Sequence, residues 1–159
     1  MAVKRSKLQH FMNTGIPATP VYNLMSLGIT NLSINKNPTY LEEGNIADEV
    51  STKILESLAP EIPFEIKVDE TDPVSVYLTK LEWEDKTMTD VYTDIVSVQL
   101  WMAPVTGAYP AKKYFVSIGV ETIGDEALKT LRHSVTAGVR GNAVFGTFNP
   151  STKAFTATV

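Results

Sequence analysis

The sequence predicts a mainly β protein, an antiparallel β-sandwich or barrel with one flanking α-helix, and three observations indicate this class. Hydrophobic and polar residues alternate with a period of two in segment after segment, which is typical of strands with one buried face. Turn residues separate these segments at short intervals. Helical spacing dominates in a single segment. The 159 residues fit one domain, 1–159, that is long enough to bury a core.

The alternation predicts seven or eight strands along the chain. Two of them are weakly patterned, at residues 21–27 and around Leu32 and Ile34. The clearer strands are expected at residues 64–68, 96–102, 114–120, 131–139 and 155–159. Turns are expected at residues 103–111 and 148–153. This number of strands in one domain favours a sandwich or barrel.

One helix is expected over residues 72–84. Asp72 suits the N-cap, and Pro73 suits the first helical position. Apolar residues then recur at helical spacing, namely Val74, Tyr77, Leu78 and Leu81. A short helix beside a sheet would cover part of an otherwise exposed face.

Two segments lack clear periodicity and are expected to extend from the domain. Residues 1–18 are predicted to form an N-terminal arm. The segment 37–63 is long and acidic, and it is punctuated by Pro38, Gly44, Pro60 and Pro63. Loops of this length are uncommon in compact domains and are usually functional or disordered, so we expect an assembly loop here.

Charge is distributed unevenly along the chain. The net charge is −4, but residues 1–36 carry +4, residues 37–95 carry −11 and residues 96–159 carry +3. An acidic middle between two basic ends can attract other copies of the same chain. The alternative is that these segments are solvated surfaces that never meet.

The sequence gives no support for an enzyme. It has no cysteine, and its two histidines, His10 and His133, are far apart. Ser134 follows His133 but lacks the glycine pattern of a nucleophile elbow, and His133 is in phase with the apolar residues of its strand. We therefore expect a structural histidine, no catalytic residue and no cofactor.

Metal, nucleotide, nucleic-acid and membrane sites are not expected either. The acids at residues 69–72 do not have the spacing of a calcium loop, and the glycines at 138, 141 and 146 do not form a phosphate-binding loop. An acidic protein repels phosphate, which disfavours DNA binding. No stretch approaches about 18 apolar residues, the length of a membrane span. Trp101 is expected on the outer face of a strand, against either the helix or another subunit.

Several segments, taken in order, resemble one family of structural proteins. They are VKRSKLQHFMNTG at the start, VYNLMSLGITNLSINKNP at residues 21–38, DPVSVYLTKL at 72–81, TGAYPA at 106–111 and VFGTFNP at 144–150. Together they resemble the major tail protein, or tail tube protein, of siphophages of Gram-positive bacteria. The resemblance rests on the order of these segments along the chain and on the matching length.

The resemblance implies a subunit that forms hexameric rings, which stack into a hollow tube through which DNA leaves the capsid. It implies a place in the virion tail after assembly in the host cytoplasm. The expected partners are other copies of the chain, the tape measure protein, the tail terminator and the distal tail protein, with no specific DNA binding and no membrane. The alternatives are a tail terminator or head–tail connector on a related β fold, and a small β-barrel enzyme or binding module.

The charge pattern and the resemblance together nominate assembly residues. The acidic candidates are Glu42, Glu43, Asp48 and Glu49 in the long loop. The basic candidates are Lys4, Arg5 and Lys7 in the arm of a neighbouring subunit, with Lys112, Lys113 and Arg140 as the second choice. Trp101 completes the set.

Overall fold

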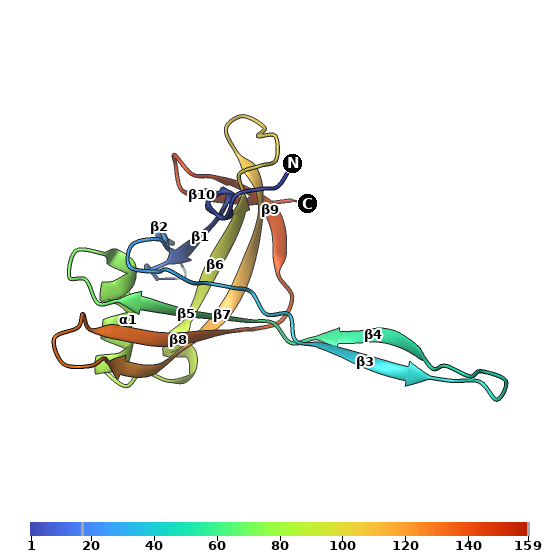
Figure 1. Ribbon diagram of the computed structural model, residues 1–159. Helices are drawn as coiled ribbons and strands as arrows, with labels where there is room; N and C mark the ends of the chain where they lie inside the picture. Colours follow the sequence, from blue (N-terminus) through green and yellow to red (C-terminus); the bar gives the residue numbers. More distant parts are fainter. Residues whose placement is uncertain (17, 159) are drawn as a thin grey trace.

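The computed structural model describes residues 1–16 and 18–158 and shows a curled β-sheet from which one long hairpin projects (Figure 1). The described strands, in chain order, are β1 Leu8–Asn13, β2 Tyr22–Leu24, β3 Pro38–Glu43, β4 Thr52–Leu58, β5 Glu61–Lys67, β6 Tyr92–Gln99, β7 Tyr109–Gly124, β8 Arg132–Val139, β9 Val144–Asn149 and β10 Ala154–Ala157. The helix α1 spans Pro73–Trp83, and two short 3₁₀ helices span Arg5–Lys7 (η1) and Met88–Val91 (η2).

The main sheet is antiparallel and is organised around the long strand β7. Its order is β10-β9-β7-β6-β1-β2, and β8 and β5 continue it from the second half of β7. The first half of β7, residues 109–113, pairs with β9, and residues 116–124 pair with β8. Because β7 pairs first with β9 and then with β8, it connects the half of the sheet that contains β9 and β10 with the half that contains β8 and β5. A β-bulge between Val120 and Thr122 adds local twist there.

The sheet curls strongly enough to form a small core on its concave face. Strands β9 and β1 are three strand spacings apart in the sheet order, about 14 Å in a flat sheet. Nevertheless, the rings of Phe148 on β9 and Phe11 on β1 lie 4.5 Å apart, centre to centre. Tyr22 on β2 meets Phe148 edge to face at 5.7 Å. Val96, Val98 and Ala111 complete this core.

The larger core lies on the opposite face of the sheet. There, Met12, Ile95, Tyr114, Val116 and Ile118 pack against residues from β5, β8 and α1. The helix presents Val74, Leu78 and Leu81 to this core. Asp72 caps it by accepting a hydrogen bond from the Val74 amide at 3.2 Å, so the helix lies within the expected range 72–84. The prediction of a mainly β fold with one flanking helix is confirmed.

The middle of the segment expected to be an N-terminal arm, Leu8–Asn13, is strand β1 of the main sheet. β1 pairs with β6 on one side and with β2 on the other, and Phe11 and Met12 are buried. β1 shows no simple alternation because both of its faces are covered, and it also buries His10 and Asn13. These polar groups find partners: His10 Nδ1 lies 2.8 Å from Ser97 Oγ, and Asn13 Oδ1 accepts from the amides of Gly15 and Val21. Pro17, the next to last residue of the expected arm, lies outside the described residues.

The expected loop 37–63 is a hairpin rather than an irregular loop. β3 pairs with β4 in a separate two-stranded sheet, and the chain then enters β5 at Glu61. Every residue of β3 and β4 is exposed. Because neither face of the hairpin is buried, its sequence lacks the alternation that marks a half-buried strand.

Smaller differences concern the ends of the sheet. Leu32 and Asn35 form only isolated bridges to β5, while β9 is a full strand that the pattern did not predict. A Cβ on Gly146 would collide with the carbonyl oxygen of Thr156, so close pairing with β10 requires glycine in β9. The strand expected at 155–159 corresponds to β10, and its last residue, Val159, lies outside the described residues.

Candidate assembly surfaces

The β3–β4 hairpin exposes apolar side chains on both of its faces. Tyr40 and Leu55 are opposite each other in the register and share one face, and Leu41 and Ile54 share the other. Each of these four side chains is between 42% and 55% exposed. Isolated two-stranded hairpins are marginally stable in water, and contiguous exposed apolar residues mark interaction sites. The hairpin therefore has the character of a surface that is completed by a neighbour.

The same hairpin carries all four acidic candidates near its tip, which we define as residues 42–50. Asp48 organises the turn, because its Oδ2 accepts hydrogen bonds from the Asn45 amide at 2.7 Å and from Asn45 Nδ2 at 3.0 Å. Glu42 pairs with Lys53 across the strands at 3.5 Å, but both side chains are about 60% exposed or more. Such a pair contributes little stability. Glu43 and Glu49 complete an acidic tip.

The three basic candidates at the N-terminus are not part of a free arm. The Arg5 guanidinium donates to the carbonyls of Leu8 at 2.6 Å and Leu32 at 3.1 Å. It also lies 3.4 Å from His10 Nε2. Arg5 thus ties η1 to β1 and to the segment before the hairpin.

Lys4 and Lys7 are exposed residues at η1, and the Lys7 carbonyl accepts from the Leu100 amide at 2.8 Å. The lysines remain available to a partner, but the backbone that carries them is held to the end of β6. They cannot reach out as a mobile tail would.

His10 is held neutral by its surroundings. Burial in the first place, and the nearby Arg5 charge in the second, lower the pKa of His10 to about 4. This small polar cluster of Arg5, His10 and Ser97 is a structural element of β1 and β6.

A groove of about 530 Å³ opens where β6, β7 and β9 extend past the cover of the larger core. The residues that define it are Leu8, Gln99, Trp101, Lys112, Tyr114 and Phe145, and we call it the Lys112 groove. Trp101 is 42% exposed and Phe145 is 66% exposed. Trp101 lies in the turn after β6, so the prediction that it would lie on a strand was wrong.

Two lysines give this groove a positive charge. Lys112 Nζ lies 5.0 Å from the centre of the Tyr114 ring and 5.2 Å from that of Phe145. At the edge, Lys36 Nζ donates to the Tyr114 hydroxyl at 3.0 Å, a hydrogen bond that raises the pKa of Lys36. Neither lysine belongs to an ion pair within the described part of the chain.

The other basic candidates face elsewhere. Lys113 follows Lys112 in β7 and therefore points to the opposite face of the sheet, where its ammonium contacts the rings of Phe115 and Phe155. Arg140 stacks on Tyr92 at 3.6 Å. The three residues that the sequence grouped together thus belong to three different surroundings.

Two further exposed features were not predicted. Val76 and Trp83, seven residues apart on α1, are 49% and 82% exposed and lie outside the stripe that faces the core. Their spacing of two helical turns was visible in the sequence. The loop between β7 and β8 carries the second feature, an exposed Leu128 with a φ of 69°.

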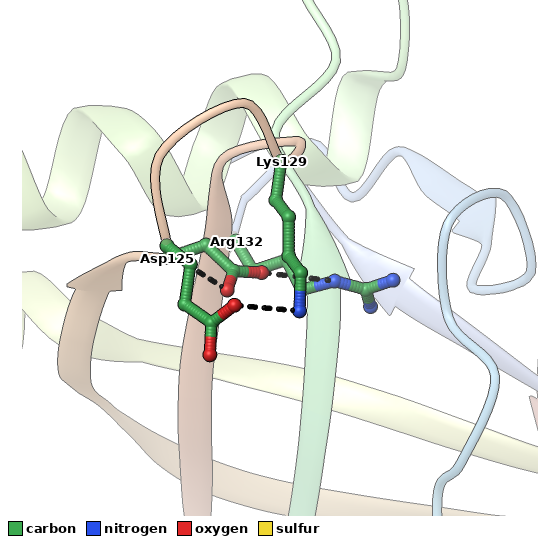
Figure 2. Close-up of polar contacts among 4 residues, drawn as sticks. Asp125, Lys129 and Arg132 are labelled. Atoms are coloured by element: carbon green, nitrogen blue, oxygen red, sulfur yellow. Dashed lines mark hydrogen bonds and ion pairs between the residues drawn. The ribbon is translucent and has the colours of Figure 1, made fainter.

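Figure 2 shows the ion pairs that hold this β7–β8 loop. Lys129 Nζ lies 2.9 Å from a Glu126 carboxylate oxygen, and Arg132 Nε lies 3.7 Å from Asp125. The first pair is well exposed and contributes little, whereas Asp125 and Arg132 are partly covered. These pairs hold the loop in a defined shape. It follows the end of β7, whereas the Lys112 groove lies near the start of that strand.

The residues considered for catalysis have structural surroundings. His133 is buried, and its Nε2 lies 3.0 Å from Thr79 Oγ1 on the helix, which itself donates to the Ser75 carbonyl. Ser134 points to the other face of β8. Within residues 1–16 and 18–158, no group of three or more His, Asp or Glu side chains could hold a metal ion. No helix in that part of the chain is long and apolar enough to cross a membrane.

Comparison with known proteins places the fold. No family model and no curated protein matches the sequence. Among solved structures, the chain is similar to the SPP1 tail tube protein, with a TM-score of 0.64 at 12% identity, covering 91% of this chain and 78% of that one. It is also similar to the tail protein of an empty GTA particle, with a TM-score of 0.59 at 9% identity over 98% of this chain and 100% of that one.

A third similar structure comes from the baseplate of the anti-feeding prophage, with a TM-score of 0.50 at 10% identity, covering 91% of this chain and 95% of that one. At these identities the likeness concerns the fold alone. The chain has the fold of phage tail tube proteins, as the resemblance implied.

Proposed function

We propose that this chain is a structural subunit of a bacteriophage tail tube and that it assembles with copies of itself into stacked rings. The observation that carries the proposal is the β3–β4 hairpin, which exposes apolar side chains on both faces and is joined to a body with the tail tube fold. A hairpin of this kind is stabilised when neighbours cover it. Rings and tubes supply such neighbours at every position.

Six subunits in a ring are the favoured number. The GTA tail to which the chain is similar was computed with C6 symmetry, and the anti-feeding prophage baseplate was sixfold symmetrised. The finer assignment, to a siphophage of Gram-positive bacteria, rests on the sequence segments quoted above. In that setting the tube is the conduit for DNA ejection, and its further partners are the tape measure protein, the tail terminator and the distal tail protein.

The charge distribution supports contacts between rings. The acidic hairpin tip, with Glu42, Glu43, Asp48 and Glu49, is proposed to meet a basic surface of a neighbouring subunit. Each exposed ion pair contributes only about 0–1 kcal/mol, but a ring repeats the contact around its circumference. The modest pairs then add together.

Electron microscopy of the purified chain over a range of concentrations tests the proposal. We expect tubes about as wide as a phage tail, with light scattering that rises as they grow. Single rings that never stack would instead favour a tail terminator or head–tail connector. A chain that remains a compact monomer at high concentration, with and without its tail partners, would refute the tube.

A further inference from the structure

The Lys112 groove lies on a part of the sheet that its own domain leaves uncovered. Tyr114 and Lys112 lie on the same face of β7, two residues apart, and Tyr114 is in the larger core while Lys112 is only partly covered. Ser97 and Gln99 continue that face on β6, and Gln99 is exposed. The groove therefore lies on the same sheet face as the larger core, beyond the part of that face that β5, β8 and α1 cover. Its floor is apolar.

The chemistry of the groove is complementary to that of the hairpin tip. Its described lining contains no carboxylate, and Lys112 and Lys36 provide positive charge beside the exposed rings of Trp101 and Phe145. Between residues 38 and 58 the hairpin has five acidic residues and one lysine. Its tip also exposes Ile46 and Val50, at 108% and 80%. Acidic and apolar groups on one surface thus match basic and aromatic groups on the other.

The hairpin of a given chain cannot fill the groove of the same chain. Lys36, at the groove edge, lies two residues before β3, and its carbonyl accepts from the Ala59 amide at the root of the hairpin. At about 3.3 Å per residue, the tip lies about 20 Å from that root. The hairpin also extends away from the body (Figure 1). The groove therefore lies at the root of the hairpin, and the tip of the same hairpin lies at its far end.

We infer that the Lys112 groove receives the hairpin tip of a second copy of this chain, an inference that rests on the proposed tube. Tip and groove are different surfaces, so the contact is head-to-tail. Contacts of this kind close into rings or continue as filaments, depending on the rotation between subunits. Trp101 and Phe145 contact the apolar residues of the tip, and Lys36 and Lys112 face its carboxylates. This assignment replaces the N-terminal residues as the main basic partner.

Charge reversal with a matched control tests the pairing. The Lys36→Glu/Lys112→Glu variant is expected to raise the subunit concentration needed for tube growth about tenfold or more, since two ion pairs become repulsive. Lys113→Glu changes the next residue of the same strand on the opposite face and is expected to leave tube growth unchanged. Adding Glu42→Lys and Glu43→Lys to the double variant is expected to restore growth. Equal effects of Lys112→Glu and Lys113→Glu, each measured alone on a folded protein, would overturn the groove.

Cross-linking gives a second readout that leaves the lysines in place. The chain has no cysteine, so Glu49→Cys in the tip and Gln99→Cys in the groove can be introduced on a clean background. A short bis-maleimide is expected to join assembled chains into a ladder on a denaturing gel. A Glu49→Cys/Glu70→Cys control, with Glu70 exposed near the start of α1, is expected to give no ladder.

The outcomes separate the groove from the tube. Tubes that form normally but show no ladder for the Glu49/Gln99 pair would refute the groove while the proposed function stands. A chain that forms neither rings nor tubes would count against both. A ladder restricted to the Glu49/Gln99 pair supports the groove.

Discussion

Replacing Phe148 with alanine is expected to remove the contact that closes the curled sheet. The side chain is 0% exposed, and its ring contacts Phe11 at 4.5 Å and Tyr22 at 5.7 Å. Truncating a buried phenylalanine to alanine typically costs about 3–5 kcal/mol, and the geometry here, with two aromatic partners, favours about 4 kcal/mol. That is a large part of the typical total stability of about 5–15 kcal/mol.

Chemical and thermal unfolding of the unassembled subunit measure this loss. For a domain of this size each kcal/mol lowers the melting temperature by about 2–4 °C, so Phe148→Ala should melt about 8–16 °C below the parent. Phe145→Ala is the matched control, because it makes the same change on the same strand at a side chain that is 66% exposed. In the described part of the chain, the Lys112 ammonium lies 5.2 Å from the centre of the Phe145 ring, and we expect a loss of about 1 kcal/mol or less when this ring is removed.

A double-mutant cycle with Phe11→Ala tests the curl directly. Residues in contact usually show a coupling of about 0.5–3 kcal/mol, whereas residues about 14 Å apart would be additive. Additive losses for Phe11 and Phe148, or equal melting temperatures for the Phe148 and Phe145 variants, would contradict the closed concave core.

Two further expectations concern stability. Leu81→Asp places a charge in the larger core, where Leu81 is buried, and should lower the free energy of unfolding by several kcal/mol in denaturant unfolding. The control Trp83→Asp, on the exposed side of α1, should lower it far less. Similar losses for the two variants would show that the helix faces are misassigned. The pKa of His10 is lowered to about 4 in the folded protein, so on acidification this histidine takes up its proton at a higher pH in the unfolded chain than in the folded one. The contribution of His10 to the free energy of unfolding should therefore fall by about 3 kcal/mol as the pH drops from about 6.5 to about 4. Relative to the parent, His10→Asn should show a flatter loss of unfolding free energy over that interval, and an unchanged slope would contradict a buried neutral histidine.

Strands with one buried face could be predicted from the sequence, because their two faces differ in polarity. β5, β8 and the second half of β7 have this character, and the helix was marked by Asp72, Pro73 and its apolar spacing. β6 is buried on both faces at residues 95–98, but part of it was still found because Val96 and Val98 alternate with the polar Ser97 and Gln99. β1 could not be found in this way, since the curl of the sheet covers both of its faces. The hairpin could not be found for the opposite reason, because both of its faces are exposed. In each case the missing information was tertiary rather than local.

The candidate surfaces show the same division between local and tertiary information. The acidic segment was visible as a charge cluster, and the structure locates it on the projecting hairpin. Grouping Lys112 with Lys113 was misleading, because adjacent residues of a strand point to opposite faces. Arg5 counted as a free charge in the sequence, yet three contacts hold it within the domain. Which charges remain available to a partner depends on the packing around them.

The exposure of the hairpin on both faces also bears on how the proposed tube would start to grow. Within the described residues the hairpin has no sheet partner outside itself, so its order depends on cross-strand pairs that are marginal in water. When the first two subunits meet, only part of one hairpin would be covered, yet both hairpins would lose conformational entropy on becoming ordered. A subunit that joins an existing ring finds preformed surfaces on more than one neighbour. Formation of the first ring is then the unfavourable step and elongation the favourable one, so a partner that presents a preformed ring would determine where assembly begins.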